Sequence, residues 1–206
     1  MKLYTFDAAP NARRVTLFMQ YKGIEIDTTQ IAMMAQEQLG DDYKKVNPEC
    51  TVPALVLDDG TVLTEVVGIC AYLEGLYPDK PLMGSSALEK AQVISWDHKL
   101  FVGLMAATAG ILRNTSKSFF NRGLPGTIDL PQIPELAERG RLQIPHILAK
   151  LNEHLANNQW LAGDNFSLAD IDLLVSIDFM AWVKQSVPDE CVHLKSWHER
   201  AAAVFA

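Results

Sequence analysis

The residue pattern changes at residues 78–86, and this change limits the possible folds of the chain more than any other feature. Before this segment, short β-prone runs alternate with helical runs; after it, only helical spacing of apolar residues is evident. The segment itself is rich in Pro, Gly and Ser, which favour a connector. We therefore predict an α+β chain of two domains, 1–78 and 87–206, with a linker at 79–86.

The first domain is expected to follow the order β-α-β-α-β-β-α. An Asp-Asp-Gly turn at 58–60 joins the last two strands as a hairpin, and the earlier part reads as a βαβ unit, so we predict a four-stranded mixed sheet. The strands are predicted at 2–6, 24–27, 54–57 and 61–63, and the helices at 13–22 and 66–77, with a short helix or irregular structure at 33–45. The all-helical second domain is predicted to contain helices at 87–115, 135–157, 167–184 and 193–204.

Charge and hydropathy exclude several classes of partner. The net charge is −7, and no run of Lys or Arg exceeds two residues, so we expect no binding of nucleic acid, which needs a cationic surface. The longest uncharged stretch near the middle, Leu100 to Leu112, has 13 residues. A membrane span needs about 20. We expect neither a membrane span nor a signal peptide.

The cysteines indicate a reduced compartment. The three cysteines are far apart and form no C-x-x-C pair, and the five histidines share no ligand spacing. We therefore expect a cytoplasmic protein without a metal site.

The segment Val46 to Leu55 carries the most informative local pattern. Pro53 opens a predicted strand, a position that proline tolerates because no ladder hydrogen bond is needed from it. One interpretation is an ordinary trans proline. The other is a cis Val52–Pro53 bond, in which the backbone N–H and C=O of Val52 turn outward and pair with an extended, peptide-like ligand.

Two predicted helix starts have recognisable residues. At Thr64-Glu65-Val66, the free N–H groups of the following helix either bind a carboxylate or are simply balanced by Glu65. At Ser167, the sequence Ser-Leu-Ala-Asp predicts an N-terminal cap in which Asp170 bonds back to the Ser167 N–H. We assign this second motif to folding, not to chemistry.

Several of these motifs together resemble the cytosolic glutathione S-transferase family. The resemblance rests on a loop with Pro-Asn after the first strand, on Asn-Pro-x-x-x-Val-Pro-Ala-Leu, and on Asp-Gly-x-x-Leu-Thr-Glu. The motif Trp-Leu-Ala-Gly-Asp-x-Phe-Ser-Leu-Ala-Asp-Ile at 160–171 adds to it. The resemblance covers nearly the whole chain and implies a thioredoxin-like first domain that binds glutathione, usually in a homodimer.

The resemblance also implies roles for particular residues. Val52, before a cis Pro53, would pair with the cysteinyl backbone of glutathione, and Glu65 with the N–H of Val66 would hold the γ-glutamyl end. Asn11 is the candidate catalytic residue beside the sulfur. The implied glutathione-binding set is Ala9, Asn11, Thr51, Val52, Pro53, Glu65 and Val66.

The resemblance places a small hydrophobic electrophile against the helix that begins at Ala87 and the loop after Thr115. Its implied contacts are Phe101, Met105 and Phe119. The expected activity is conjugation of glutathione to this electrophile, as in detoxification, or reduction of a disulfide or peroxide. The alternative is a non-catalytic regulator of the same fold, similar to the stringent starvation proteins.

This chain departs from the family pattern at three positions. Ala9 stands where many members have a catalytic serine, Val66 replaces a serine that contacts the glutamyl carboxylate, and Cys50 replaces a glycine. The first two changes favour the non-catalytic alternative, whereas Val52-Pro53 and Glu65 favour glutathione binding. Cys50 is either a bystander in its loop or a thiol that forms a mixed disulfide with glutathione.

Overall fold

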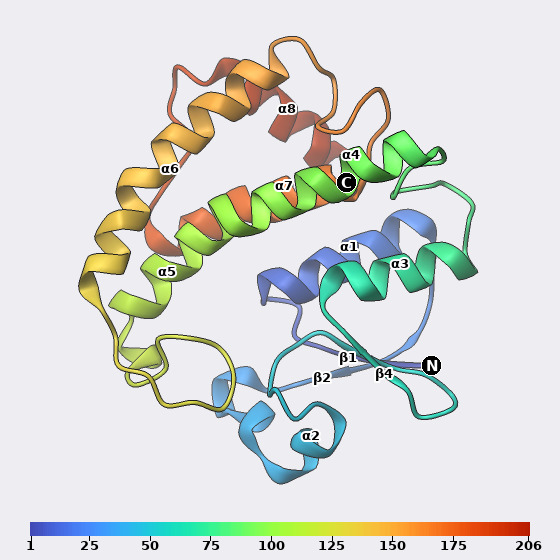
Figure 1. The fold of residues 1–206 in the computed structure, drawn as a ribbon, viewed down its shortest axis with the longest axis vertical. Coiled ribbons are helices and arrows are strands. Elements are labelled where there is room, and N and C mark those ends of the chain that lie inside the picture. The colour runs from blue at the N-terminus through green and yellow to red at the C-terminus, as the bar shows by residue number, and fades with distance from the viewer. The chain divides into compact units, whose positions relative to one another are not determined.

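The computed structural model describes residues 1–206, which fall into two compact units. The first unit contains Met1–Lys80 and a later segment, Leu124–Ile128, and the second contains Pro81–Gly123 and Asp129–Ala206. The first unit combines a sheet with helices, and the second is helical (Figure 1). This is the thioredoxin-like plus all-helical fold expected from the sequence.

The sheet of the first unit has four strands in the order β2-β1-β3-β4. Strand β1 is parallel to β2 and antiparallel to β3, and β3 is antiparallel to β4, so the predicted mixed sheet is confirmed. The observed strands are β1 (Lys2–Thr5), β2 (Asp27–Gln30), β3 (Ala54–Val56) and β4 (Val62–Thr64). The helices of this unit are α1 (Pro10–Lys22), α2 (Asp41–Val46) and α3 (Val66–Leu76).

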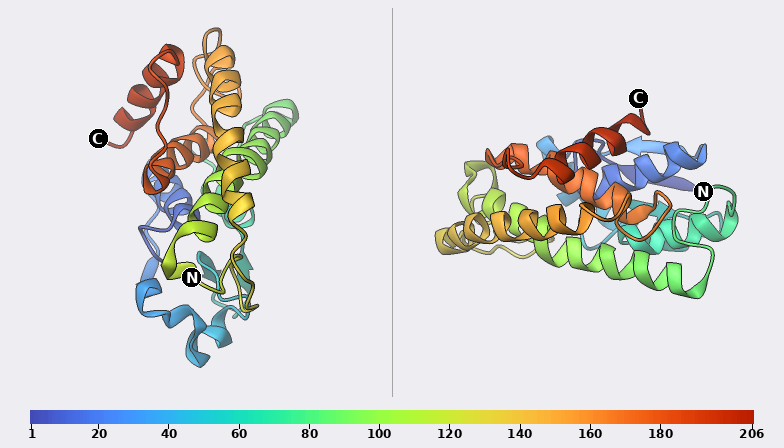
Figure 2. Two further views of the ribbon diagram at one scale, coloured as in Figure 1. Left: turned by 90° about the vertical axis from the view of Figure 1, so that its left-hand side faces the viewer. Right: turned by 90° about the horizontal axis from the view of Figure 1, so that it is seen from above.

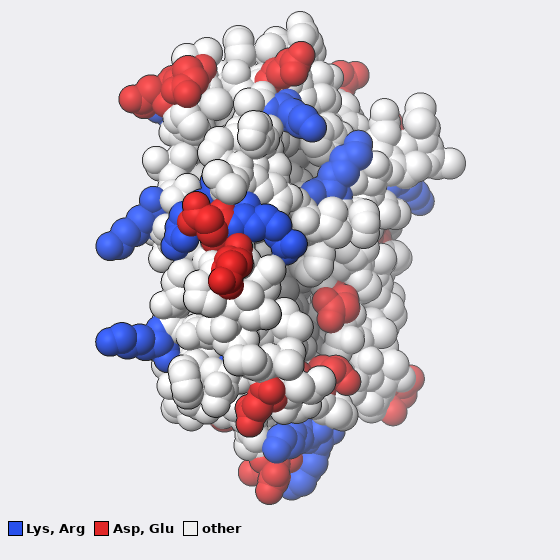
Figure 3. Space-filling view, turned by 60° about the vertical axis from the view of Figure 1, so that its left-hand side comes forward, with Lys and Arg blue, Asp and Glu red and all other residues white.

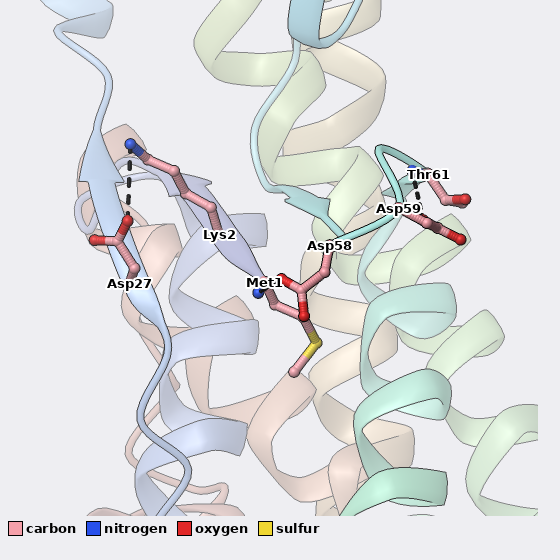
Figure 4. Close-up of polar contacts among 6 residues, drawn as sticks. All are labelled: Met1, Lys2, Asp27, Asp58, Asp59 and Thr61. Carbon is pink, nitrogen blue, oxygen red and sulfur yellow. Dashed lines mark hydrogen bonds and ion pairs between the residues drawn. The ribbon is translucent and has the colours of Figure 1, made fainter.

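Polar contacts join neighbouring strands of this sheet and stabilise the turn between β3 and β4 (Figure 4). Lys2 on β1 forms an ion pair with Asp27 on the neighbouring strand β2, with Nζ and Oδ2 3.8 Å apart. The N-terminal amine binds the carboxylate of Asp58, and the backbone N–H of Thr61 donates to Asp59 Oδ1. The last bond closes the predicted Asp-Asp-Gly turn between β3 and β4.

The predicted strand at 24–27 is wrong, because its first residues complete the end of α1. Gly23 lies in the left-handed conformation with φ of 69°, and the N–H of Ile24 donates to Met19 O at 2.9 Å. This pattern is the usual C-terminal cap of a helix that ends at glycine. Ile24 is therefore buried by capping instead of by sheet pairing, and the strand begins later, at Asp27.

Helix α7 (Leu168–Met180) is the most deeply buried helix of the second unit. The other helices are α4 (Ala87–Leu100), α5 (Ala106–Thr115), α6 (Pro134–Leu155) and α8 (Val192–Ala203). Helices α4, α5 and α8 pack against α7, and α5 runs beside α6 (Figures 1 and 2). None of these helices, or of those in the first unit, combines the length and apolar character needed to cross a membrane.

The predicted long helix at 87–115 is continuous but not regular. Its middle, Phe101–Met105, is wound as a π-helix between α4 and α5. A π-turn inserts an extra residue in the helix and rotates the face that follows. Apolar spacing alone does not reveal such a turn.

The cap at Ser167 is confirmed and extends further than its motif predicts. Asp170 Oδ2 accepts from both the N–H and the hydroxyl of Ser167, each at 3.0 Å. Its other oxygen accepts from the Leu161 N–H and from Trp197 Nε1, also at 3.0 Å. Burial raises the pKa of Asp170 to about 6, and these hydrogen bonds oppose the shift. One carboxylate therefore joins the start of α7, the preceding loop and α8.

Candidate functional site

The register of the sheet brings three segments of the first unit to one end of it. Tyr4 on β1 lies opposite Ala54 on β3, and Ala54 lies opposite Thr64 on β4. Because neighbouring strands here are antiparallel, the end of β1, the start of β3 and the end of β4 coincide. The segments that follow β1, precede β3 and follow β4 are those in which the sequence analysis placed its glutathione-binding residues.

A small apolar cluster supports two of these segments. Ala12 from the start of α1 and Val52 from the loop before β3 are buried in one cluster with Ile31 and Tyr43. Ala9 packs against the same cluster. The start of α1 and the Val52–Pro53 loop are thus side by side, as the predicted site requires.

The backbone of Val52 has no hydrogen-bond partner in the structure. The peptide bond between Val52 and Pro53 is cis. The side chain of Val52 is buried, but neither its N–H nor its C=O makes a hydrogen bond within residues 1–206. Backbone groups in a folded protein nearly always have a partner. A donor and an acceptor on one residue are suited to pairing with an extended peptide-like ligand.

The position of this loop depends on Asn47, the first residue of the Asn-Pro motif, and on Tyr43, which no motif indicated. The Tyr43 hydroxyl donates to Thr51 O at 2.6 Å, and Asn47 Nδ2 donates to the same oxygen at 2.9 Å. Both side chains are buried, and burial raises the pKa of Tyr43 to about 12. The sequence signal for Asn47 was the Asn-Pro pair of the loop motif. No part of that motif points to Tyr43.

Helix α3 presents its N-terminus at this end of the sheet. Glu65 caps the helix with φ of 63° and ψ of 137°, an unusual backbone for a residue other than glycine. Its carbonyl accepts from the Ile69 N–H at 3.0 Å, and its side chain is exposed and makes no capping bond. The first N–H groups of the helix, starting with Val66, have no partner within it and attract an anion.

Helix α1 presents a second N-terminus at the same end. Ala9 is the N-cap and has no side-chain hydrogen bond, Pro10 is the first helical residue, and Asn11 follows. Asn11 Oδ1 accepts a hydrogen bond of 3.3 Å from the buried guanidinium of Arg14. This bond leaves the amide Nδ2 of Asn11 as a donor without a partner in the structure.

A buried glutamine is a further polar group of the first unit that the sequence analysis missed. Gln38 is 1% exposed, and neither atom of its side-chain amide has a hydrogen-bond partner. It lies in the 3-10 turn Glu37–Leu39. Such groups are rare in folded proteins, because an unsatisfied buried amide is costly. No motif marked this residue.

The cysteines and histidines do not assemble a metal site. All three cysteines are free and buried, and no group of three or more His, Cys, Asp or Glu residues is placed to hold a metal ion. The Cys50 sulfur donates to Pro48 O at 3.5 Å, and Cys70 lies on the buried face of α3. Burial raises the pKa of Cys191 above its ordinary value.

The three predicted acceptor residues lie in the second unit and differ in exposure. Phe101 is 43% exposed and Met105 only 6%, so the π-helical segment presents Phe101 but not Met105. Phe119 is half-buried in the short turn Lys117–Phe119, below the guanidinium groups of two arginines.

Two family models match most of the chain. The family model described as "Glutathione S-transferase, N-terminal domain" matches residues 8–76, and "Glutathione S-transferase, C-terminal domain" matches residues 106–204. Glutathione S-transferase 2 of Saccharomyces cerevisiae is 28% identical, over 97% of this chain and 84% of its own length. Glutathione S-transferase GstA of Escherichia coli is 29% identical, over 98% and 92%.

Solved structures show the same similarity. A glutathione S-transferase domain-containing protein of Marinobacter aquaeolei is 32% identical over the full length of both chains, with a TM-score of 0.89. Gtt2 of Saccharomyces cerevisiae is 27% identical over 97% of this chain and 95% of its own, with a TM-score of 0.88. The chain belongs to the glutathione S-transferase family, in which glutathione is the co-substrate.

Proposed function

We propose that this protein is a glutathione transferase whose tripeptide site is the end of the sheet described above. The observation that carries the proposal is the unpaired backbone of Val52 beside two helix N-termini. The cysteinyl backbone of glutathione pairs with the N–H and C=O of Val52. Its γ-glutamyl carboxylate binds the N–H of Val66, and the carboxylate of Glu65 binds the γ-glutamyl ammonium. Ala9, Thr51 and Pro53 shape the walls of this site.

Asn11 is proposed to stabilise the glutathione thiolate in place of the missing serine. A free thiol has a pKa of about 8.5. A hydrogen bond to a charged group contributes about 1.5–3 kcal/mol, which lowers the thiol pKa by about 1–2 units. The amide Nδ2 of Asn11 is available for this bond because Arg14 engages the amide oxygen. The N–H groups at the start of α1 add to the effect.

The thiolate then acts as a nucleophile. In conjugation, its sulfur attacks the electrophilic carbon of a hydrophobic acceptor, a C–S bond forms, and the leaving group departs with the bonding electrons. In disulfide reduction, the thiolate attacks one sulfur, a mixed disulfide forms, and the other sulfur leaves as a thiolate. Relatives are named for both kinds of chemistry, since "Disulfide-bond oxidoreductase YfcG" of Escherichia coli is 27% identical over 95% of this chain.

A non-catalytic regulator of the same fold remains the second candidate, because Ala9 and Val66 each lack a hydroxyl that the family pattern provides. Titration calorimetry with glutathione separates the two. A transferase should bind glutathione and accelerate conjugation of a chlorodinitrobenzene. Absence of both heat and thermal stabilisation at millimolar glutathione would contradict the transferase.

Two variants test the assigned residues. Asn11→Ala should raise the pKa of bound glutathione, followed by thiolate absorbance; an unchanged titration would move the role to backbone N–H groups. Glu65→Gln should weaken glutathione binding about tenfold, on the magnitude of a charged hydrogen bond. Glu25→Gln is the matched control, since Glu25 is exposed in the same unit and forms no ion pair in the structure.

We further propose that the protein works as a cytoplasmic homodimer, the usual state in this family. Light scattering on the purified protein should give twice the chain mass of 22.9 kDa. A monomer at micromolar concentration would contradict the dimer without affecting the proposed glutathione site.

A further inference from the structure

A pair of arginines without acidic partners lies at the end of α5. Arg113 is in the last turn of α5, and Arg122 is in the loop that follows. The guanidinium carbon of Arg113 is 4.8 Å from the centre of the Phe119 ring, and that of Arg122 is 5.9 Å from it. Two positively charged side chains therefore lie against one aromatic ring.

Neither charge is neutralised within the structure. Arg113 Nη1 donates one hydrogen bond, of 3.1 Å, to the carbonyl oxygen of Arg122, and the side chain of Arg122 makes none. No carboxylate lies within 4.0 Å of either guanidinium among residues 1–206. Burial and the charge of Arg122 lower the pKa of Arg113 to about 10. Two half-buried like charges repel each other, and a bound anion would offset that repulsion.

The surrounding sequence accentuates this charge. Residues 100–128 contain no Asp or Glu but hold Arg113, Lys117 and Arg122, although the whole chain has a net charge of −7. On the face shown in Figure 3, basic and acidic side chains are interspersed over a largely uncharged surface. A local excess of positive charge in an acidic protein favours an anionic ligand over a neutral one.

The chemistry of the ligand follows from the side chains that are present. Guanidinium groups bind carboxylates through paired hydrogen bonds, and few other side chains match that geometry. Phe119 and the 71% exposed Phe120 provide aromatic surface beside them. An aromatic body with one carboxylate satisfies both features, whereas a neutral aromatic satisfies only the second.

We propose that Arg113 and Arg122 bind the carboxylate of an aromatic ligand whose ring lies against Phe119. This inference goes beyond the proposed transferase function and does not depend on it: it assigns the helical unit a site of its own for an aromatic carboxylate. The ligand is bound and not chemically changed.

The first test measures binding alone, without glutathione. Calorimetry compares a naphthoate with the corresponding naphthamide, which has the same ring system but no charge. The wild type should bind the naphthoate about tenfold more tightly, the size of one charged hydrogen bond. Equal affinities would overturn the proposal, whatever the protein does with glutathione.

The second test removes one guanidinium. Arg122→Gln should abolish most of the preference for naphthoate and leave naphthamide binding unchanged, because the Arg122 side chain makes no hydrogen bond that supports the fold. Arg122→Lys should restore part of the preference, since it keeps the charge but not the paired donors. Arg139→Gln removes the same charge from an exposed position on α6 and should have no effect. Equal weakening of both ligands in Arg122→Gln would show a structural role and overturn the proposal.

Discussion

Tyr43 donates a hydrogen bond of 2.6 Å to the carbonyl oxygen of Thr51, the residue directly before Val52. Tyr43 is on α2, so the bond joins this short helix to the loop before the cis proline. Asn47 supplies a second donor to the same oxygen. Two buried side chains therefore hold the residue before Val52, whose backbone is proposed to bind glutathione.

Removal of the Tyr43 hydroxyl tests this positioning role. Tyr43→Phe loses a bond of about 1 kcal/mol, so glutathione affinity should fall about fivefold in titration calorimetry. Asn47 still holds the Thr51 carbonyl, which limits the loss. Tyr77→Phe, at the exposed end of α3, is the control and should bind glutathione as the wild type does. Unchanged affinity in Tyr43→Phe would mean that Asn47 alone fixes the loop.

The same phenol predicts a loss of stability at high pH. Its folded pKa of about 12 exceeds the ordinary value of 10.0, so the folded chain binds this proton more tightly than the unfolded chain does. The stabilising contribution is complete below about pH 10 and is lost as the pH rises to about 12. The free energy of unfolding should therefore fall more steeply over this range in the wild type than in Tyr43→Phe. Phenolate absorbance that shows Tyr43 ionising with the exposed tyrosines would contradict this expectation.

Asp170 should be among the most costly single positions in the second unit. Asp170→Asn replaces one carboxylate oxygen by an NH2 group. This group cannot accept the hydrogen bonds that the oxygen accepts in the wild type, and the donors lose their partner. Because an unsatisfied buried donor costs about 1–3 kcal/mol, we expect a loss of about 3 kcal/mol in chemical denaturation. Asp164→Asn is the control, since Asp164 is exposed and has no partner. A loss below about 1 kcal/mol would show that the network tolerates one reversed amide.

Two glycine-to-alanine changes should have opposite effects. A Cβ on Gly140 of α6 would lie 2.8 Å from Ala107 O and 2.9 Å from Ile111 Cγ1, so α5 and α6 would have to separate. We expect Gly140→Ala to lower the free energy of unfolding by about 2 kcal/mol, a typical cost of overpacking. Gly75 of α3 has nothing within 4 Å of a Cβ, and Gly75→Ala should stabilise by about 0.5 kcal/mol. A more stable Gly140→Ala variant would mean that α5 and α6 can move apart without loss of stability.

The sequence by itself determined the order of the elements, the mixed sheet and the cap at Ser167, because these depend on local periodicity, turn residues and short-range hydrogen bonds. It also pointed to Val52, Pro53 and Glu65, which are adjacent to strand ends. Local patterns gave a wrong prediction where one residue fits two elements. The alternation around Ile24 predicts a strand, but its N–H bonds to the end of α1. The π-helical turn at 101–105 left no periodic signal.

Only the tertiary structure decided which distant residues act together. The bond from Tyr43 to Thr51 and the four donors on Asp170 link positions whose spacing carries no pattern. Arg113 is in a helix and Arg122 lies nine residues later, in the loop that follows, so helical spacing does not relate them. The turn at Phe119 nevertheless brings both guanidinium groups close to one aromatic ring. Hydrogen bonds and charge pairs depend on distance in space, and that distance is fixed only when the chain has folded.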